Sequence, residues 1–160
     1  ESLAKYGLRK EGWWKSILFS LVAFLPLFAL YLVRGIKTYM PMVNVLTIYE
    51  WLQQGFPNFL IGMVPTIFVW GVVQAVCYAL LCDKLNISDP VKHEWLQMGP
   101  IYCGIFYLVL NGYGFSVARL PEMLLTFLTI WGLCHARRLS GGNSWGTVLV
   151  FSLLLNAFLV

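Results

Sequence analysis

The sequence predicts an all-α integral membrane protein, a single helical bundle of about five transmembrane helices within 160 residues. Three observations support this prediction. Hydrophobic residues make up 59% of the chain and charged residues only 11%, whereas a soluble domain carries about 25% charged residues. The mean hydropathy is +0.74. The seven Trp and eight Tyr residues fit the belts that aromatic side chains form at the two faces of a bilayer.

Five apolar segments are candidates for membrane helices, since a spanning helix needs about 20 mostly apolar residues. The second segment contains Pro65 and is long, which predicts a kink or a tilt. The third is interrupted by Gly112 and Gly114, and the fourth is short unless the residues before it join the helix. The expected segments are 14–33, 56–81, 98–111, 121–134 and 145–160.

The remaining segments are expected to lie at the membrane surface, so that residues 1–160 form one transmembrane domain. Residues 1–13 are an interfacial lead-in, 34–55 an external loop and 83–97 a cytoplasmic loop. The external loop is expected to contain a short interfacial helix with Tyr49 and Trp51.

The distribution of basic residues predicts a cytoplasmic N-terminus. Five spans place eight Lys and Arg residues on the side of the N-terminus and three on the other, and cytoplasmic loops carry the excess of basic residues. This topology explains the pI of about 9.0 better than a nucleic-acid partner does. The eight are Lys5, Arg9, Lys10, Lys15, Lys84, Lys92, Arg137 and Arg138, and the three are Arg34, Lys37 and Arg119.

The four cysteines and two histidines give no sign of a metal or cofactor. Cys77, Cys82, Cys103 and Cys134 fall in or beside apolar segments without a Cys-x-x-Cys pair, which is typical of small apolar residues. A metal site draws three or four ligands together. His93, next to Glu94, and His135 belong to different loops, and we expect them to be solvated at the interface.

Several polar residues lie at membrane depth, and we expect them to form hydrogen bonds between helices. They are Gln74, Asn111, Ser152 and Asn156, and such bonds contribute about 0.6 kcal/mol on average. Asn111→Ala and Ser152→Ala are each expected to cost about 1 kcal/mol of stability. Ser152 and Asn156 should lie one helical turn apart. Arg119 and Glu122 are either an intramembrane ion pair or, as we favour, two side chains that face water.

The segment from Ser140 to Asn156, SGGNSWGTVLVFSLLLN, resembles the last motif of the CPBP family of intramembrane CAAX proteases and bacteriocin-processing proteins. That motif has a Gly-containing turn, a Trp and, after apolar residues, a His with an Asn four residues on. Ser152 takes the place of the His, and Asn156 matches the Asn.

Two further segments resemble the other motifs of the family. In IYCGIFYLVLN, Tyr107 and Asn111 take the places of the Phe and His of Phe-x-x-x-His. In FVWGVVQAVCYALLCDKL, Val69 and Trp70 replace the two glutamates of the first motif, and Gln74 replaces its arginine. The lead-in YGLRK, followed by Trp13, also resembles that of the family.

The resemblance therefore implies a family member without the catalytic Glu and His residues, in a prokaryotic plasma membrane. Amides cannot take a proton from water near neutral pH. We accordingly expect a non-catalytic pseudo-enzyme in which Gln74, Tyr107, Asn111, Ser152 and Asn156 keep a polar network. It would act as an accessory subunit of a larger complex, in contact with lipids and another integral membrane protein.

Two alternatives remain open. The first is an atypical intramembrane hydrolase that uses Glu50, Glu122, His93 or His135. An acid and a histidine at opposite faces would be separated by about 30 Å of hydrocarbon, so only a cluster of His93, Glu94 and His135 would suit it. The second is a membrane protein that binds or conducts a small solute or holds a cofactor.

Overall fold

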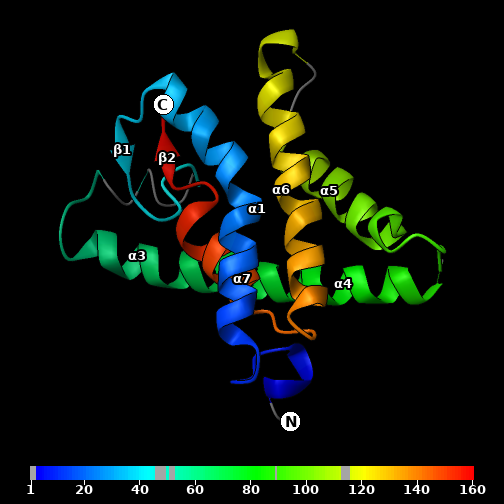
Figure 1. Cartoon of the computed structure of the whole chain (residues 1–160). Helices are drawn as coiled ribbons and strands as arrows, with labels where there is room; N and C mark the ends of the chain where they lie inside the picture. The colour runs from blue at the N-terminus through cyan, green and yellow to red at the C-terminus, as the bar shows by residue number, and fades with distance from the viewer. Residues whose placement is uncertain (1–2, 46–49, 51–52, 89, 113–115) are drawn as a thin grey trace.

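A computed structural model describes residues 3–45, 50, 53–88, 90–112 and 116–160 of the chain. Nearly all of the described residues belong to helices or to the short connections between them (Figure 1). The main helices are α1 (Trp13–Arg34), α3 (Asn58–Thr66), α4 (Gln74–Ser88), α5 (Met98–Leu110), α6 (Leu120–Leu139) and α7 (Trp145–Leu149). The 3-10 turns are η1 (Leu3–Tyr6), η3 (Glu94–Leu96) and η4 (Val117–Arg119), and η2 (Ile67–Val73) and η5 (Val150–Leu154) are π-helical.

Helix α1 has 22 residues, which at 1.5 Å per residue give a length of about 33 Å, enough to cross the hydrocarbon core. Gly12 precedes it with a φ of 73°. One face of α1 is buried against α6 and α7, and the opposite face exposes large apolar side chains such as Leu18, Val22 and Leu25. This distribution is what a helix needs when lipid covers one side and protein the other.

Helix α3, the π-helical segment η2 and helix α4 form one continuous helix over 58–88. The π-helical turns begin two residues after Pro65. The kink or tilt expected from this proline stays a prediction. In Figure 1 this helix passes across the other helices rather than alongside them. Its end at Ser88 differs from the expected end near residue 81, so the start of the predicted 83–97 loop is helical.

Helices α5 and α6 both start next to a proline or glycine and pack tightly on each other. Gly104 of α5 meets the ring of Phe127 of α6 so closely that a Cβ atom at residue 104 would lie 2.6 Å from the ring. Helix α6 continues to Leu139, five residues past the expected end of the fourth segment. It therefore carries Cys134 and His135 inside the helix rather than in a loop.

The fifth segment is helical only in its first part, which differs from the prediction. Helix α7 and segment η5 end at Leu154, after which the chain becomes extended at Leu155 and left-handed at Asn156, with a φ of 62°. The two-residue strand β2 (Phe158–Leu159) then pairs antiparallel with β1 (Thr38–Tyr39). These bonds satisfy backbone groups that the helix no longer pairs.

The predicted external loop at 34–55 is partly buried. Met42 and Val43 are 1% and 2% exposed, and Met40 and Asn44 donate backbone hydrogen bonds to Ala157 and Asn156. The predicted interfacial helix with Tyr49 and Trp51 lies outside the described residues.

The two ends of the bundle differ in character. Segments that surround Arg9, Asp83, Arg137 and Arg138 meet at one end, which we call the basic end. The ends of α1 and α6 that carry Arg34 and Glu122, together with β1 and β2, form the opposite end. Arg9, Arg137 and Arg138, which the sequence assigns to one side of the membrane, thus share one end of the fold. The orientation of that end relative to the membrane stays a prediction.

Among the residues that the structure describes, three helices are long and apolar enough to cross a membrane: 13–34, 58–88 and 117–139. The helical part of 145–154 is shorter, and α5 has 13 residues. The chain is thus an all-α helical membrane protein, as its composition predicts.

Candidate functional site

Three of the five predicted polar residues come together at the opposite end of the bundle. The Nδ2 atom of Asn156 donates a hydrogen bond to the hydroxyl of Tyr107, at 3.2 Å. Asn111 lies one helical turn after Tyr107 and donates its own Nδ2 proton to the Tyr107 carbonyl, at 2.9 Å. Asn156 faces α5 because the chain has left the helix and turned back at that residue.

Asn111 and Asn156 line a cavity of about 490 Å³ between α1, α5, α6 and the extended C-terminal segment. Its size is within the range of about 300–1,000 Å³ that is usual for small-molecule sites. Its lining is mainly polar, in contrast to the apolar surface around it. The lining residues are Tyr31, Asn44, Asn111, Gly112, Arg119, Glu122, Asn156, Phe158, Leu159 and Val160.

The charges at this cavity are arranged differently from the sequence prediction. Glu122 forms an ion pair with Arg34 of α1, at 2.5 Å, and not with Arg119. The Arg34 and Glu122 side chains are 30% and 22% exposed. Arg119 is exposed and, within the described part of the chain, has no ion-pair partner. The lining therefore has one cation that Glu122 does not neutralise.

Ser152 and Gln74 lie apart from this group, so the predicted five-residue network does not form. Ser152 packs against Gly71 of η2, and its hydroxyl has no hydrogen-bond partner among the described residues. Gln74 lines an apolar hollow on the surface between α4 and α5. Ser152 and Asn156 are not one helical turn apart, since the helix ends between them.

The two positions that correspond to the glutamates of the CPBP motif face outward. Val69 and Trp70 are 52% and 48% exposed and line the same apolar hollow as Gln74. In the register that the sequence favours, these positions therefore lie away from Tyr107 and Asn156.

The candidate acids and histidines are not positioned for joint chemistry. His135 is 2% exposed and packs between the rings of Trp95 and Trp131, with centroids 5.0 and 4.4 Å away. The prediction that it is solvated is wrong, because α6 extends past it. Glu122 precedes it by 13 residues on the same helix, an axial distance of about 20 Å.

Within the described residues, the cluster of His93, Glu94 and His135 that would suit an atypical hydrolase is not brought together as a group of ligand atoms. His93 is exposed, as predicted. The Glu94 carboxylate accepts a hydrogen bond from Arg138, at 3.0 Å.

Asn143 at the basic end is a structural residue that was not predicted from the sequence. This residue is fully buried, and its Nδ2 atom donates to the carbonyls of Arg9 and Glu11, both at 2.7 Å. Its Oδ1 atom accepts a hydrogen bond from the Trp145 amide, at 3.0 Å. The position of Asn143 after two glycines and before a helix was the signal available in the sequence.

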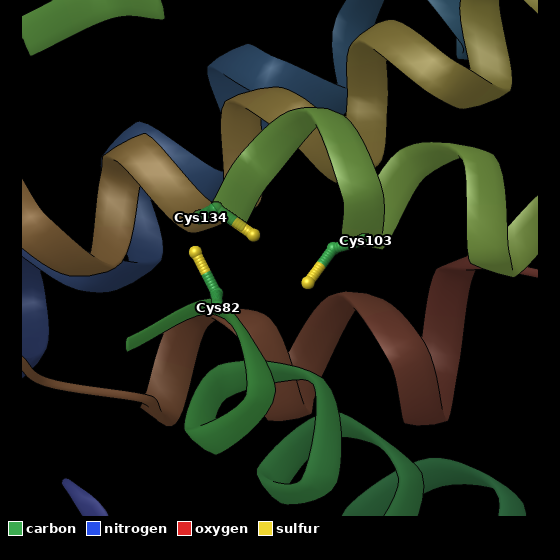
Figure 2. Close-up of side chains that lie close together, drawn as sticks. All are labelled: Cys82, Cys103 and Cys134. Carbon is green, nitrogen blue, oxygen red and sulfur yellow. The ribbon is translucent and has the colours of Figure 1, made fainter. Parts of the chain in front are cut away.

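Three cysteines form a cluster that was not predicted from the sequence either. Cys82 of α4, Cys103 of α5 and Cys134 of α6 have their sulfur atoms within 4.8 Å of one another (Figure 2). Cys77, five residues before Cys82 on α4, is exposed and lies outside the cluster. No spacing rule in the sequence connects three residues that come from three helices.

Comparison with known proteins gives one partial likeness. Aquaporin-7 of Rattus norvegicus is 35% identical to this chain over 101 residues, which are 61% of this chain and 36% of that protein. The chain thus spans about a third of the length of this relative. No family model matches the chain, and no solved structure matches it. The chain is a helical membrane protein with a partial likeness to an aquaporin.

Proposed function

We propose that this protein binds a small anionic solute in the polar cavity at the opposite end of the bundle. The observation that supports the proposal is the cavity lining, in which Asn111, Asn156 and Arg119 are placed around a space of about 490 Å³. Amide groups donate and accept hydrogen bonds, and the guanidinium group only donates. A solute with a carboxylate or phosphate group complements this set.

Three features support binding rather than catalysis. Glu122, the acid at the cavity, is held by Arg34. The lining contains neither a histidine nor a cysteine. The amides that remain have no affinity for protons near neutral pH. In this proposal the chain is a CPBP-like protein whose polar positions bind a ligand and do not cleave one.

The partial likeness to an aquaporin, a name that denotes a channel for a small solute, supports the handling of a solute by this chain. The matched part covers 61% of this chain. We also propose that the basic end faces the cytoplasm of a prokaryotic cell, with the cavity open on the other side of the plasma membrane. The segments around Arg9, Arg137 and Arg138 support this orientation, since basic residues favour the cytoplasmic side.

The experiment compares thermal unfolding of the detergent-purified protein with succinate and with succinamide, its uncharged analogue, at equal concentration. A bound ligand stabilises the folded state by about 2.7 kcal/mol at 100 times its Kd. We expect succinate to raise the melting temperature and succinamide to have little effect. We expect Arg119→Gln to abolish the rise.

The matched control is Arg138→Gln, which removes a guanidinium group at the basic end, where Arg138 pairs with Glu94. The control should keep the full response to succinate. An equal rise with succinamide, or an unchanged response in Arg119→Gln, would contradict the proposal.

A second candidate function is that of an accessory subunit in a membrane complex, and one surface hollow favours it. This hollow has a volume of about 660 Å³ and an almost entirely apolar lining contributed by α1, η2, α7 and η5. It suits the apolar face of a partner's transmembrane helix. Trp13 and Trp145 lie in the lining.

The test is purification in mild detergent with mass spectrometry of what remains bound at a fixed ratio. Leu153→Trp places a bulky ring in this hollow, and Leu81→Trp places one in the hollow beside Gln74. Loss of a stoichiometric membrane partner in Leu153→Trp alone is the expected result. The role would be contradicted if both variants kept the partner. It would also be contradicted if the wild-type protein purified without a stoichiometric membrane partner.

A further inference from the structure

The three clustered cysteines have the arrangement of a metal site rather than of isolated apolar side chains. They come from α4, α5 and α6, and Figure 2 shows the three side chains close together in the space between these helices. Cys82 and Cys103 are 4% and 0% exposed. All the sulfur atoms lie within 4.8 Å of one another.

The spacing is close to that of a metal bound by three thiolates. With metal–sulfur bonds of about 2.3 Å, an ion at the centre of the triangle requires sulfur atoms about 4 Å apart. The sulfurs of Cys82, Cys103 and Cys134 therefore need to move by less than 1 Å, in line with rotation of side chains without displacement of helices.

The identity of the metal follows from the number and type of the ligands. Within the described part of the chain, no fourth Cys, His, Asp or Glu belongs to the cluster. Asp83, next to Cys82, is paired with Arg137, and His135, next to Cys134, is packed between two indole rings. Structural zinc normally has four ligands, whereas thiolates also select monovalent copper, which is stable with three.

We propose that Cys82, Cys103 and Cys134 bind one monovalent copper ion. Each thiol loses its proton on binding, the three sulfur atoms donate electron pairs to the copper ion, and the copper remains monovalent. The protons leave to the solvent at the basic end. Metal binding to cysteines is coupled to such proton release.

Two polar side chains lie beside the cluster. Arg137, which is paired with Asp83, lines a small cavity together with Cys82 and Cys134. Asn86 donates a hydrogen bond from Nδ2 to the sulfur of Cys82, at 3.7 Å. Partners of this kind around the ligands typically change metal affinity by about 10- to 100-fold.

A route to the cluster exists from the basic end. A groove of about 470 Å³ is lined by Cys82 and Cys134 together with Asp83, Asn86 and Arg138. A copper ion can therefore reach two of the three sulfurs from outside the hydrocarbon region. Cys103 is fully buried and completes the set behind them.

The experiment is an anaerobic titration of the reduced, detergent-purified protein with monovalent copper, with bicinchoninate as the competing chelator. We expect one ion per chain. Cys82→Ser, Cys103→Ser and Cys134→Ser should each weaken binding by about 100-fold or more. The matched control is Cys77→Ser on the same helix as Cys82, and it should bind as the wild type does.

X-ray absorption on the copper-loaded wild type provides a readout that does not depend on folding of the variants. Three sulfur neighbours are expected. Two or fewer, an equal loss of affinity in Cys77→Ser, tighter binding of Zn²⁺ than of monovalent copper, or a disulfide between two of the clustered cysteines would each overturn the proposal.

Discussion

The Nδ2 atom of Asn156 lies 3.2 Å from the hydroxyl oxygen of Tyr107, so a residue just beyond η5 is attached to α5. The bond crosses 49 positions of the sequence. It holds a non-glycine residue with a φ of 62°, a conformation that asparagine tolerates better than most residues do. The bond holds Asn156, a lining residue of the polar cavity, against α5.

Tyr107→Phe removes the hydroxyl from this bond. We expect a loss of about 1 kcal/mol in the free energy of unfolding and a weaker response to succinate, because the Asn156 amide loses an acceptor. Chemical or thermal unfolding in detergent measures the first effect. Tyr102→Phe, at a residue on the same helix that is 48% exposed, should change neither quantity. Equal stabilities for the two variants would contradict the role of the bond.

Ser152→Ala should leave stability unchanged within about 0.5 kcal/mol or raise it. The hydroxyl of Ser152 is buried without a partner in the described structure, so its removal costs no hydrogen bond. This result differs from the loss expected from the sequence. The contrast is Ser140→Ala: both serines are 6% exposed, but the Ser140 hydroxyl donates to the Ala136 carbonyl at 2.8 Å. A larger loss for Ser152→Ala than for Ser140→Ala would show that Ser152 has a polar role.

Gly146→Ala should destabilise the protein by about 1–3 kcal/mol. A Cβ atom at residue 146 would lie 2.5 Å from the carbonyl carbon of Ser16, so α1 and α7 would have to separate. Backbone atoms cannot rotate out of the way as a flexible side chain can. Thermal unfolding checks the loss, and Leu128→Ala, at a residue on α6 that is 41% exposed, provides the comparison. A Gly146→Ala protein as stable as the Leu128→Ala protein would refute the close contact.

Asn143→Ala should cost at least as much as Gly146→Ala, roughly 1–3 kcal/mol or more. It leaves the carbonyls of Arg9 and Glu11 and the amide of Trp145 without their partner. Proteolysis of the segment before α1 should become faster in this variant. Asn44→Ala serves as the control, because Asn44 donates a single side-chain bond, to Phe158 at 2.9 Å, at the other end. Similar proteolysis rates in both variants would argue against the prediction.

Apolar composition and segment length were sufficient to predict the helices, because a chain in lipid must satisfy its backbone groups internally. They could not predict where the last helix ends. Leu154 and Leu155 have the same side chain, so the change of conformation there depends on contacts of the residues that follow. These contacts are the bond from Asn156 to Tyr107, the bond from Asn44 to the Asn156 carbonyl and the pairing of β2 with β1.

The direction in which each side chain points from its helix could not be predicted from the sequence either. Polar residues in apolar segments indicated a polar site, and Tyr107, Asn111 and Asn156 do gather. Gln74 does not, because the rotation of α4 turns it toward an outer hollow. The same rotation brings Cys82 toward α5 and α6. Such rotations depend on how the helices pack, and a single sequence does not reveal them.

The hydrogen bonds of Asn143 to Arg9 and Glu11 cross 134 and 132 positions of the chain, and they constrain the order of assembly during synthesis. The segment before α1 leaves the ribosome before residue 143 is made. The carbonyls of Arg9 and Glu11 therefore have no Asn143 amide to accept from until then. Until then α1 lacks α7, the neighbour that covers Ser16. The bundle therefore closes late, after insertion of α6, and a nascent chain halted before residue 143 leaves its first helix incompletely packed.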